Sequence, residues 1–200
     1  LRTIQPSEYQ IFIYRQFLCM WSSLASLLNN KTWLNDYYRL VEAEHKPYQL
    51  KIALETGFNF PDTLITSSPE KALEFWEKCN KEMIIKTLIL SPMEDKVVHT
   101  NKFTKEFITK IERLKSSPVI LQQFVKKKYD LRITVVGDHI FPARIDSDND
   151  IDWRKGNIKI SEFNLPSSIT EKCFQLVKTM GLKYGCIDMV VTSNDEYFFL

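Results

Sequence analysis

The alternation of apolar and polar residues is clearest over residues 119–136, where two apolar runs flank a short basic connector at 126–128. In the second run the apolar residues fall on one face, and Asp130, Arg132 and Thr134 fall on the other. Since successive side chains of a strand point to opposite faces, this period predicts a half-buried strand that directs an acid and an arginine the same way. We interpret the polar face as one wall of a nucleotide cleft.

Other segments follow a helical or a strand-like period. Apolar residues recur at steps of three and four, which predicts helices at residues 8–30, 37–44, 46–57, 69–79, 104–115 and 169–180. Shorter apolar runs predict strands at residues 63–66, 83–90, 97–100, 139–145, 184–191 and 197–200, with a hairpin turn at Gly137 and Asp138. We expect the first helix to be a packing helix whose apolar face belongs to a core. The alternation of these helices with strands and hairpins predicts an α+β chain of two subdomains that meet near residues 116–125.

Composition narrows the function classes. The chain has 200 residues, 44% of them apolar, and 27 basic residues against 25 acidic ones, so a polyanionic partner is not indicated. We expect no nucleic-acid partner, and we expect the lysines of 126–128 to form a solvated turn. The sequence has no apolar run of about eighteen residues, so we expect no membrane partner.

The four cysteines are scattered and form no C-x-x-C pair, which argues against a zinc finger or a disulfide scaffold. This usage is typical of a reducing compartment, so we expect a cytoplasmic protein. Cys79 and Cys173 fall on apolar helix faces and are predicted to be core residues. The chain begins at Leu1 and stops within an apolar strand at Leu200, and we expect further residues beyond both ends.

Charged residues inside apolar strands are the strongest candidates for chemistry. Lys86 and Asp188 each interrupt such a strand. Lys86 either reaches water from an edge strand or binds a phosphate, and Asp188 is either a hydrogen-bonded buried acid or a metal ligand. The acidic loop 146–150 resembles a calcium loop, but it lacks the glycine at the sixth position and the glutamate at the twelfth, so calcium is not favoured.

Four segments carry a family resemblance. They are Lys46–Leu50, Phe60–Thr66, Tyr129–Asp138 and Asp152–Arg154. In this order they resemble the ATP-grasp enzymes over residues 46–200, and most of all the peptide maturases that make microviridin-type graspetides. The resemblance implies an ATP-grasp fold of two α+β subdomains that clasp ATP, at residues 45–118 and 119–200, after the tail of an N-terminal domain at residues 1–44.

The resemblance also implies roles for single residues. Lys46 and Lys86 match lysines that reach the phosphates of ATP, and Gln123, Phe124 and Val125 match the hinge whose backbone holds the adenine. The family's phosphate flap is often rich in glycine, whereas residues 87–96 contain none. This departure puts the flap contacts in doubt.

The remaining matches concern the ribose, the reacting groups and the metal. Asp130 matches an acid near the ribose, and Arg132 and Arg154 match catalytic arginines near the phosphates and the activated carboxylate. Asp188 matches the first Mg²⁺ ligand. The other ligands of the family, in a Glu-x-Asn motif, would follow the last strand, and the sequence stops before them at Leu200.

The resemblance therefore implies an enzyme that uses ATP and Mg²⁺ to activate Asp or Glu side chains of a ribosomal precursor peptide, leader plus core, as acyl phosphates. Thr or Ser hydroxyls, or Lys amines, of the same peptide would then close ω-ester or ω-amide rings. It also suggests a homodimer. Two alternatives stay open: a ligase that adds an amino acid to a protein or a small-molecule carboxylate, and a non-catalytic binding module.

Overall fold

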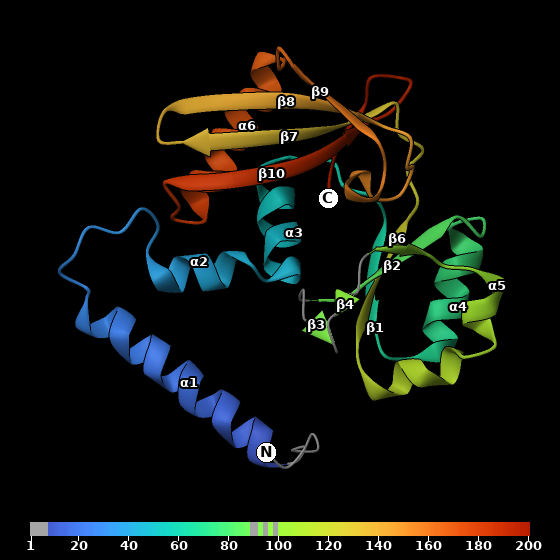
Figure 1. Ribbon diagram of the computed structural model, residues 1–200. Helices are drawn as coiled ribbons and strands as arrows, with labels where there is room; N and C mark the ends of the chain where they lie inside the picture. Colours follow the sequence, from blue (N-terminus) through green and yellow to red (C-terminus); the bar gives the residue numbers. More distant parts are fainter. Residues whose placement is uncertain (1–7, 89–91, 94–95, 98–99) are drawn as a thin grey trace.

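The computed structural model describes residues 8–88, 92–93, 96–97 and 100–200, and it has an α+β architecture built on two antiparallel sheets (Figure 1). A four-stranded sheet has the order β1-β6-β2-β5, and a five-stranded sheet has the order β11-β10-β7-β8-β9. Two short strands, β3 (Pro92–Met93) and β4 (Lys96–Val97), pair only with each other. The α+β prediction is confirmed.

The four-stranded sheet consists of β1 (Thr63–Thr66), β2 (Met83–Lys86), β5 (Asn101–Lys102) and β6 (Val119–Gln123). Helix α4 (Pro69–Lys78) packs against it and buries Ala72, Phe75 and Trp76 over Met83 and Leu121. The helix begins where the sequence predicts, because Ser68 accepts a hydrogen bond from the Lys71 N–H and a proline occupies the first helical turn.

The five-stranded sheet consists of β7 (Tyr129–Val136), β8 (His139–Ser147), β9 (Ile158–Glu162), β10 (Tyr184–Val191) and β11 (Tyr197–Phe199). Helices α3 (Lys46–Glu55) and α6 (Ser167–Thr179) cover one face of it. Their contact with Leu131, Ile133 and Val135 forms the larger core. Gly137 has a φ of +56°, so it supplies the left-handed turn that joins β7 to β8.

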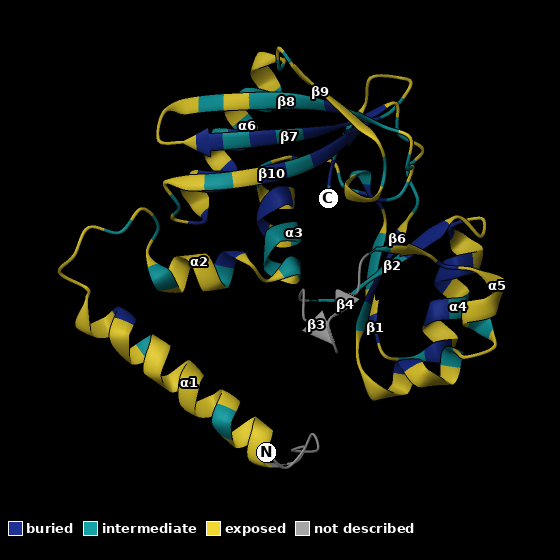
Figure 2. Ribbon diagram, in the orientation of Figure 1, coloured by how far each residue is buried: buried dark blue, intermediate teal, exposed yellow. Residues whose placement is uncertain are grey.

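The N-terminal part consists of α1 (Glu8–Leu27) and α2 (Tyr37–Ala43). The predicted helix is confirmed, but its predicted place in a core is wrong for the described chain. Tyr9, Phe12 and Phe17 are each more than half exposed, and Ala25 is buried (Figure 2). A period of 3.6 residues specifies an apolar face on a helix but does not specify what covers that face.

Three other predicted elements differ from the structure. The single helix predicted over 104–115 is two short pieces, α5 (Lys105–Ile108) and a 3₁₀ helix, η1 (Ile111–Ser116), because the backbone leaves helical geometry at Lys110, with a φ of −117°. The strand predicted over 83–90 is shorter in the structure: β2 ends at Lys86, residues 87–88 belong to no strand, and residues 89–90 lie outside the described residues. The strand predicted over 97–100 is described only at Val97, in β4, and at residue 100, which belongs to no strand.

The chain passes from the four-stranded sheet to the five-stranded sheet between β6 and β7. Strand β6 pairs with β1 and β2, so the chain leaves the four-stranded sheet only after Gln123. Helix α3, which precedes β1 in sequence, packs on the core of the five-stranded sheet. Cys79 and Cys173 are buried, as predicted. In the described part of the chain, no helix is both long and apolar enough to cross a membrane.

Candidate active site

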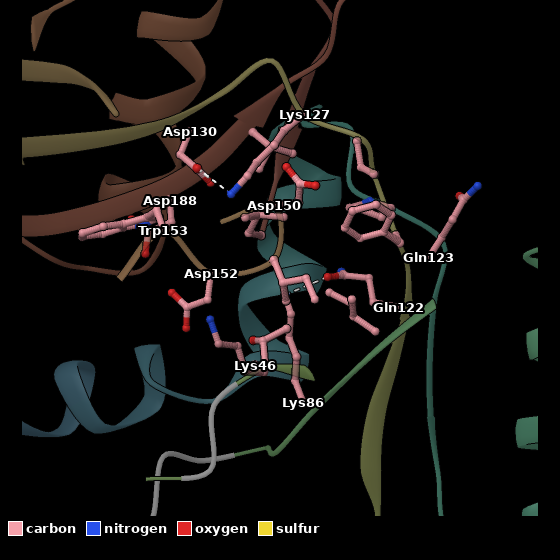
Figure 3. A pocket seen from close by; sticks show the side chains of 18 of the residues that line it. Lys46, Lys86, Gln122, Gln123, Lys127, Asp130, Asp150, Asp152, Trp153 and Asp188 are labelled. Atoms are coloured by element: carbon pink, nitrogen blue, oxygen red, sulfur yellow. Dashed lines mark hydrogen bonds and ion pairs between the residues drawn. The ribbon is translucent and has the colours of Figure 1, made fainter. Parts of the chain in front are cut away.

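A cleft of about 640 Å³ lies between the two sheets. It is lined by each of the predicted site residues except Arg132. Figure 3 shows Lys46 and Lys86 on one side of this cleft and Asp130 and Asp188 on the other. The structure therefore brings together side chains that lie up to 142 positions apart in the sequence, between Lys46 and Asp188.

Two lysines enter the cleft from different elements. Lys46 is the first residue of α3, and Lys86 is the last residue of β2. Burial lowers the pKa of Lys46, and burial together with the Lys46 charge lowers the pKa of Lys86 to about 8. Since β2 lies between β6 and β5, the edge-strand alternative for Lys86 is wrong. Its Nζ donates instead to Oε1 of Gln122, at 2.8 Å.

Asp188 lies between two arginines. Strand register places it opposite Arg132, whose Nη1 is 3.0 Å from Oδ1 of Asp188. Nη2 of Arg154 lies 3.0 Å from Oδ2 of the same carboxylate. The Asp188 side chain is 30% exposed and lines the cleft, so this cluster faces an incoming ligand. Arg132 borders the cleft through Asp188.

Hydrogen bonds within the loop of residues 147–157 hold Arg154 in place. Oδ1 of Asn149 accepts hydrogen bonds from the N–H groups of Ile151 and Asp152, and Asp148 accepts two from Asn157. The 3₁₀ helix η2 (Trp153–Lys155) follows, with the Arg154 guanidinium 4.4 Å from the centre of the Trp153 ring. Asp148, one of the three acidic residues that suggested a calcium loop, thus closes the loop through Asn157.

Lys127 belongs to the site although the sequence analysis placed it in a solvated turn. Its Nζ lies 2.7 Å from Oδ2 of Asp130, and the two side chains are only 6% and 5% exposed. Burial raises the pKa of Asp130, and the Lys127 charge opposes that shift. The prediction of a solvated turn is wrong for Lys127 and holds for Lys126 and Lys128, which are exposed. The sequence did contain a signal for this pair, because Lys127 precedes an acid, Asp130, by three residues at the start of a strand.

The backbone N–H groups of the hinge, residues 123–125, differ in their hydrogen bonds. The Gln123 N–H donates to the carbonyl of Asp62 at 2.8 Å, and the Phe124 N–H donates to the carbonyl of Glu82 at 2.9 Å. Among the described residues, the Val125 N–H donates no hydrogen bond to the backbone. A flat heterocycle in the cleft would therefore meet the Val125 N–H as an available donor.

Two further polar residues were missed. Asp152 lines the cleft with a side chain 8% exposed, and its Oδ1 accepts from the N–H of Arg154. Gln122 is 2% exposed and lies inside β6. The rule that selected Lys86 and Asp188, a polar residue inside an apolar strand, also applies to Gln122 and would have found it.

The donors fit a Mg²⁺ site that a nucleotide completes. Mg²⁺ takes oxygen ligands, and nucleotide enzymes hold it through one or two carboxylates together with phosphate oxygens. Asp188 supplies such a carboxylate at the cleft. Within the described residues, no group of three or more His, Cys, Asp or Glu side chains could hold a metal.

Residues 43–200 match the family model of the RimK-like ATP-grasp domain. Among solved structures, the macrocyclase MdnC of Microcystis aeruginosa MRC, bound with precursor peptide MdnA, is 30% identical, with a TM-score of 0.84. That match covers 100% of this chain and 65% of MdnC. A RiPP-associated ATP-grasp ligase of Chryseobacterium gregarium, in complex with ADP, a leader and a core peptide, is 27% identical, with a TM-score of 0.81. That match covers 98% of this chain and 62% of the ligase.

Another relative is named for a substrate other than the peptides bound in these two structures. The α-aminoadipate–LysW ligase LysX of Sulfurisphaera tokodaii is 28% identical over 141 residues, which are 66% of this chain and 48% of that ligase. The chain thus spans about half the length of this relative and less than two thirds of the two structural relatives.

Proposed function

Because the chain belongs to the RimK-like ATP-grasp domain family, we propose that it forms the nucleotide-binding and catalytic part of an ATP-dependent peptide ligase. The observation that carries this proposal is the cleft between the sheets, where Lys46 and Lys86 face Asp188 and its two arginines. Four cations around one cleft suit a triphosphate, which needs its charge neutralised before its terminal phosphoryl group is transferred.

Each predicted role is compatible with a position in the cleft. The Val125 N–H is available for the edge of an adenine, and Asp130 also lines the cleft, where it would meet a ribose. Lys46 and Lys86 would neutralise phosphate oxygens. Mg²⁺ held by Asp188 would supply additional positive charge at those oxygens.

The proposed reaction has two steps. A substrate carboxylate attacks the γ-phosphorus of ATP, the bond to the bridging oxygen of ADP breaks, and an acyl phosphate forms. A hydroxyl or amine then attacks the acyl carbon, gives its proton to solvent, and displaces inorganic phosphate. Arg132 and Arg154 would stabilise the negative charge that develops in both steps. No side-chain nucleophile is required, since positioning and charge neutralisation carry the catalysis.

We propose a ribosomal precursor peptide as the substrate, with Asp or Glu side chains as the activated carboxylates and Thr, Ser or Lys side chains as the nucleophiles. The support comes from MdnC, which is bound with a precursor peptide, and from the Chryseobacterium gregarium ligase, which holds a leader and a core peptide. The product would be a macrocycle closed by ω-ester or ω-amide bonds.

The test incubates the purified protein with ATP, Mg²⁺ and the short peptide encoded beside its gene, and follows the mass of the peptide and the release of phosphate. We expect the peptide to lose the mass of one water for each phosphate released. Hydroxylamine then cleaves an ester and leaves an amide intact. ATP binding without any change in peptide mass would overturn the macrocyclase proposal.

The similarity to LysX supports a second candidate, a ligase that joins a free amino acid to a carboxylate of a protein or a small molecule. The same experiment separates the two, because ligation of an added amino acid increases the mass of the acceptor, whereas ring closure decreases it. A peptide that gains mass only when amino acids are supplied would favour this candidate.

A further inference from the structure

Gln122 is a buried polar residue that the proposed function does not use. Its side chain is 2% exposed and lies in β6, opposite Thr63 of β1 and Ile84 of β2. A buried amide that finds no partners destabilises the fold, so its contacts indicate why such a residue occupies an otherwise apolar strand.

A chain of hydrogen bonds fixes the orientation of the Gln122 amide. The Thr63 hydroxyl donates to the Pro61 carbonyl at 2.7 Å, which uses its single proton. Thr63 Oγ1 can therefore only accept from Gln122, and Nε2 of Gln122 lies 2.9 Å from it. With its nitrogen directed at Thr63, the amide directs its oxygen at Lys86, whose Nζ lies 2.8 Å from Oε1 (Figure 3).

We propose that Gln122 is a positioning residue for Lys86: the amide, oriented through Thr63, holds the Lys86 ammonium at the cleft wall for contact with a phosphate of the bound nucleotide. This inference rests on the proposed function, because it assumes that the cleft binds a nucleotide. Among the described residues, Lys86 uses one of its three N–H donors, on Gln122, which leaves two for phosphate oxygens.

The charges around Lys86 explain why a neutral partner is suitable. Lys46 on α3 repels it, while Asp188 on β10 and Asp152 before η2 attract it. An unrestrained lysine side chain would turn away from Lys46 and toward the carboxylates. A carboxylate in place of Gln122 would hold it but would also neutralise it, whereas the amide oxygen leaves the full positive charge for the ligand.

The first experiment compares Gln122→Met with the unchanged protein by measuring the dissociation constants of ATP and of adenosine by calorimetry. Methionine keeps the length of the side chain and removes both hydrogen bonds. We expect ATP to bind about 10-fold more weakly, the size of one lost charge-assisted contact, and adenosine to bind equally well. A matched control is Gln175→Met on the exposed face of α6, which should change neither constant.

The second experiment places Gln122→Met in a Lys86→Met background. If Gln122 acts through Lys86, the double variant binds ATP no more weakly than Lys86→Met alone. Thr63 gives an independent variant if Gln122→Met does not fold. Thr63→Val removes the acceptor that orients the amide and should weaken ATP binding, whereas Thr63→Ser keeps the hydroxyl and should retain it.

The outcomes separate this inference from the proposed function. If Lys86→Met leaves ATP binding unchanged, the proposed nucleotide cleft itself is wrong. If Lys86→Met weakens ATP binding but Gln122→Met and Thr63→Val do not, only the positioning role is wrong. Equal losses for ATP and adenosine in Gln122→Met would also overturn it, because they would indicate a general disturbance of the sheet.

Discussion

The two sheets position their charged residues in different ways. In the five-stranded sheet, β7 and β10 pair over eight residues, and that register alone sets Arg132 opposite Asp188. In the four-stranded sheet, Lys86 ends a four-residue strand, and its side chain is held by the Gln122 amide. The long ladder places Arg132 directly opposite its charged partner, whereas Lys86 lies opposite Ile120 in the register and is held by a residue two positions farther along β6.

The largest effect is expected at the cluster that the β7–β10 register assembles. Asp188→Asn keeps the shape of the side chain and removes the charge between Arg132 and Arg154. We expect ATP-dependent turnover to fall by about 10²–10³-fold, since a preorganised charge at the reacting centre is lost. Steady-state release of phosphate measures this. Asp138→Asn, at the exposed tip of the β7–β8 hairpin, is the control and should leave turnover unchanged. Near-normal turnover in Asp188→Asn would contradict the assigned role.

A second change tests the buried pair where the two sheets meet. Lys127→Met leaves the Asp130 carboxylate buried without its cation, and we expect the free energy of unfolding to fall by about 3 kcal/mol near neutral pH. Urea denaturation measures this loss. Lys126→Met, which removes an exposed lysine, should change stability by less than about 0.5 kcal/mol.

The same variant predicts a pH dependence. Burial raises the pKa of Asp130 even with Lys127 present, and removal of Lys127 raises it further. A carboxyl whose folded pKa lies above its unfolded pKa opposes folding at high pH, and that cost disappears as pH falls below the unfolded value. The difference in stability between Lys127→Met and the unchanged protein should therefore shrink on acidification. A difference that grows in acid would contradict the assignment.

A third prediction concerns Lys86. Its pKa of about 8 means that the ammonium loses its proton as pH rises through that value, while phosphate binding requires the charged form. ATP affinity should therefore decrease as pH rises through about 8, and binding just above that pH should be accompanied by proton uptake. Calorimetry in two buffers of different ionisation enthalpy detects the uptake. Lys86→Met should reduce this proton uptake, and an undiminished uptake in that variant would locate the titration elsewhere.

The smallest effect is expected at the turn between β7 and β8. Gly137→Ala should cost about 1 kcal/mol of unfolding free energy, because alanine is disfavoured at a φ of +56°. Apart from Gly137 and its two chain neighbours, no heavy atom of the described residues lies within 4 Å of the position of an added Cβ, so the cost comes from the local backbone alone. Gly137→Asn is the comparison, since asparagine tolerates this region better and should cost less. Thermal unfolding of the two variants ranks them.

Some residues could be assigned from sequence because the local pattern contains their whole explanation. The alternation over β7 predicted that Asp130 and Arg132 share a face, and the structure confirms it. Ser68 and Pro69 predicted the start of α4, and Gly137 predicted the hairpin turn. In each case neighbours within a few positions decide the conformation, so no knowledge of distant residues is needed.

Other assignments failed because their partners are distant or their environment is set by packing. The helical period over α1 predicted an apolar face, yet those side chains are exposed. Lys127 lay in a run of three lysines, and although Asp130 is only three positions away, the burial of both side chains is set by packing. The salt bridge between Arg154 and Asp188 spans 34 positions and depends on how loop 147–157 closes.

The sequence by itself determined most of the elements of this protein, the family it resembles and the charged residues that interrupt apolar strands, because these follow from local periodicity and from motif order. Only the tertiary structure decided which charges meet. It enclosed Lys127 with Asp130, directed Gln122 at Lys86, and closed Arg154 onto Asp188. The physical reason is that burial and the approach of distant charges depend on how the two sheets and their loops are arranged around the cleft, which no local pattern encodes.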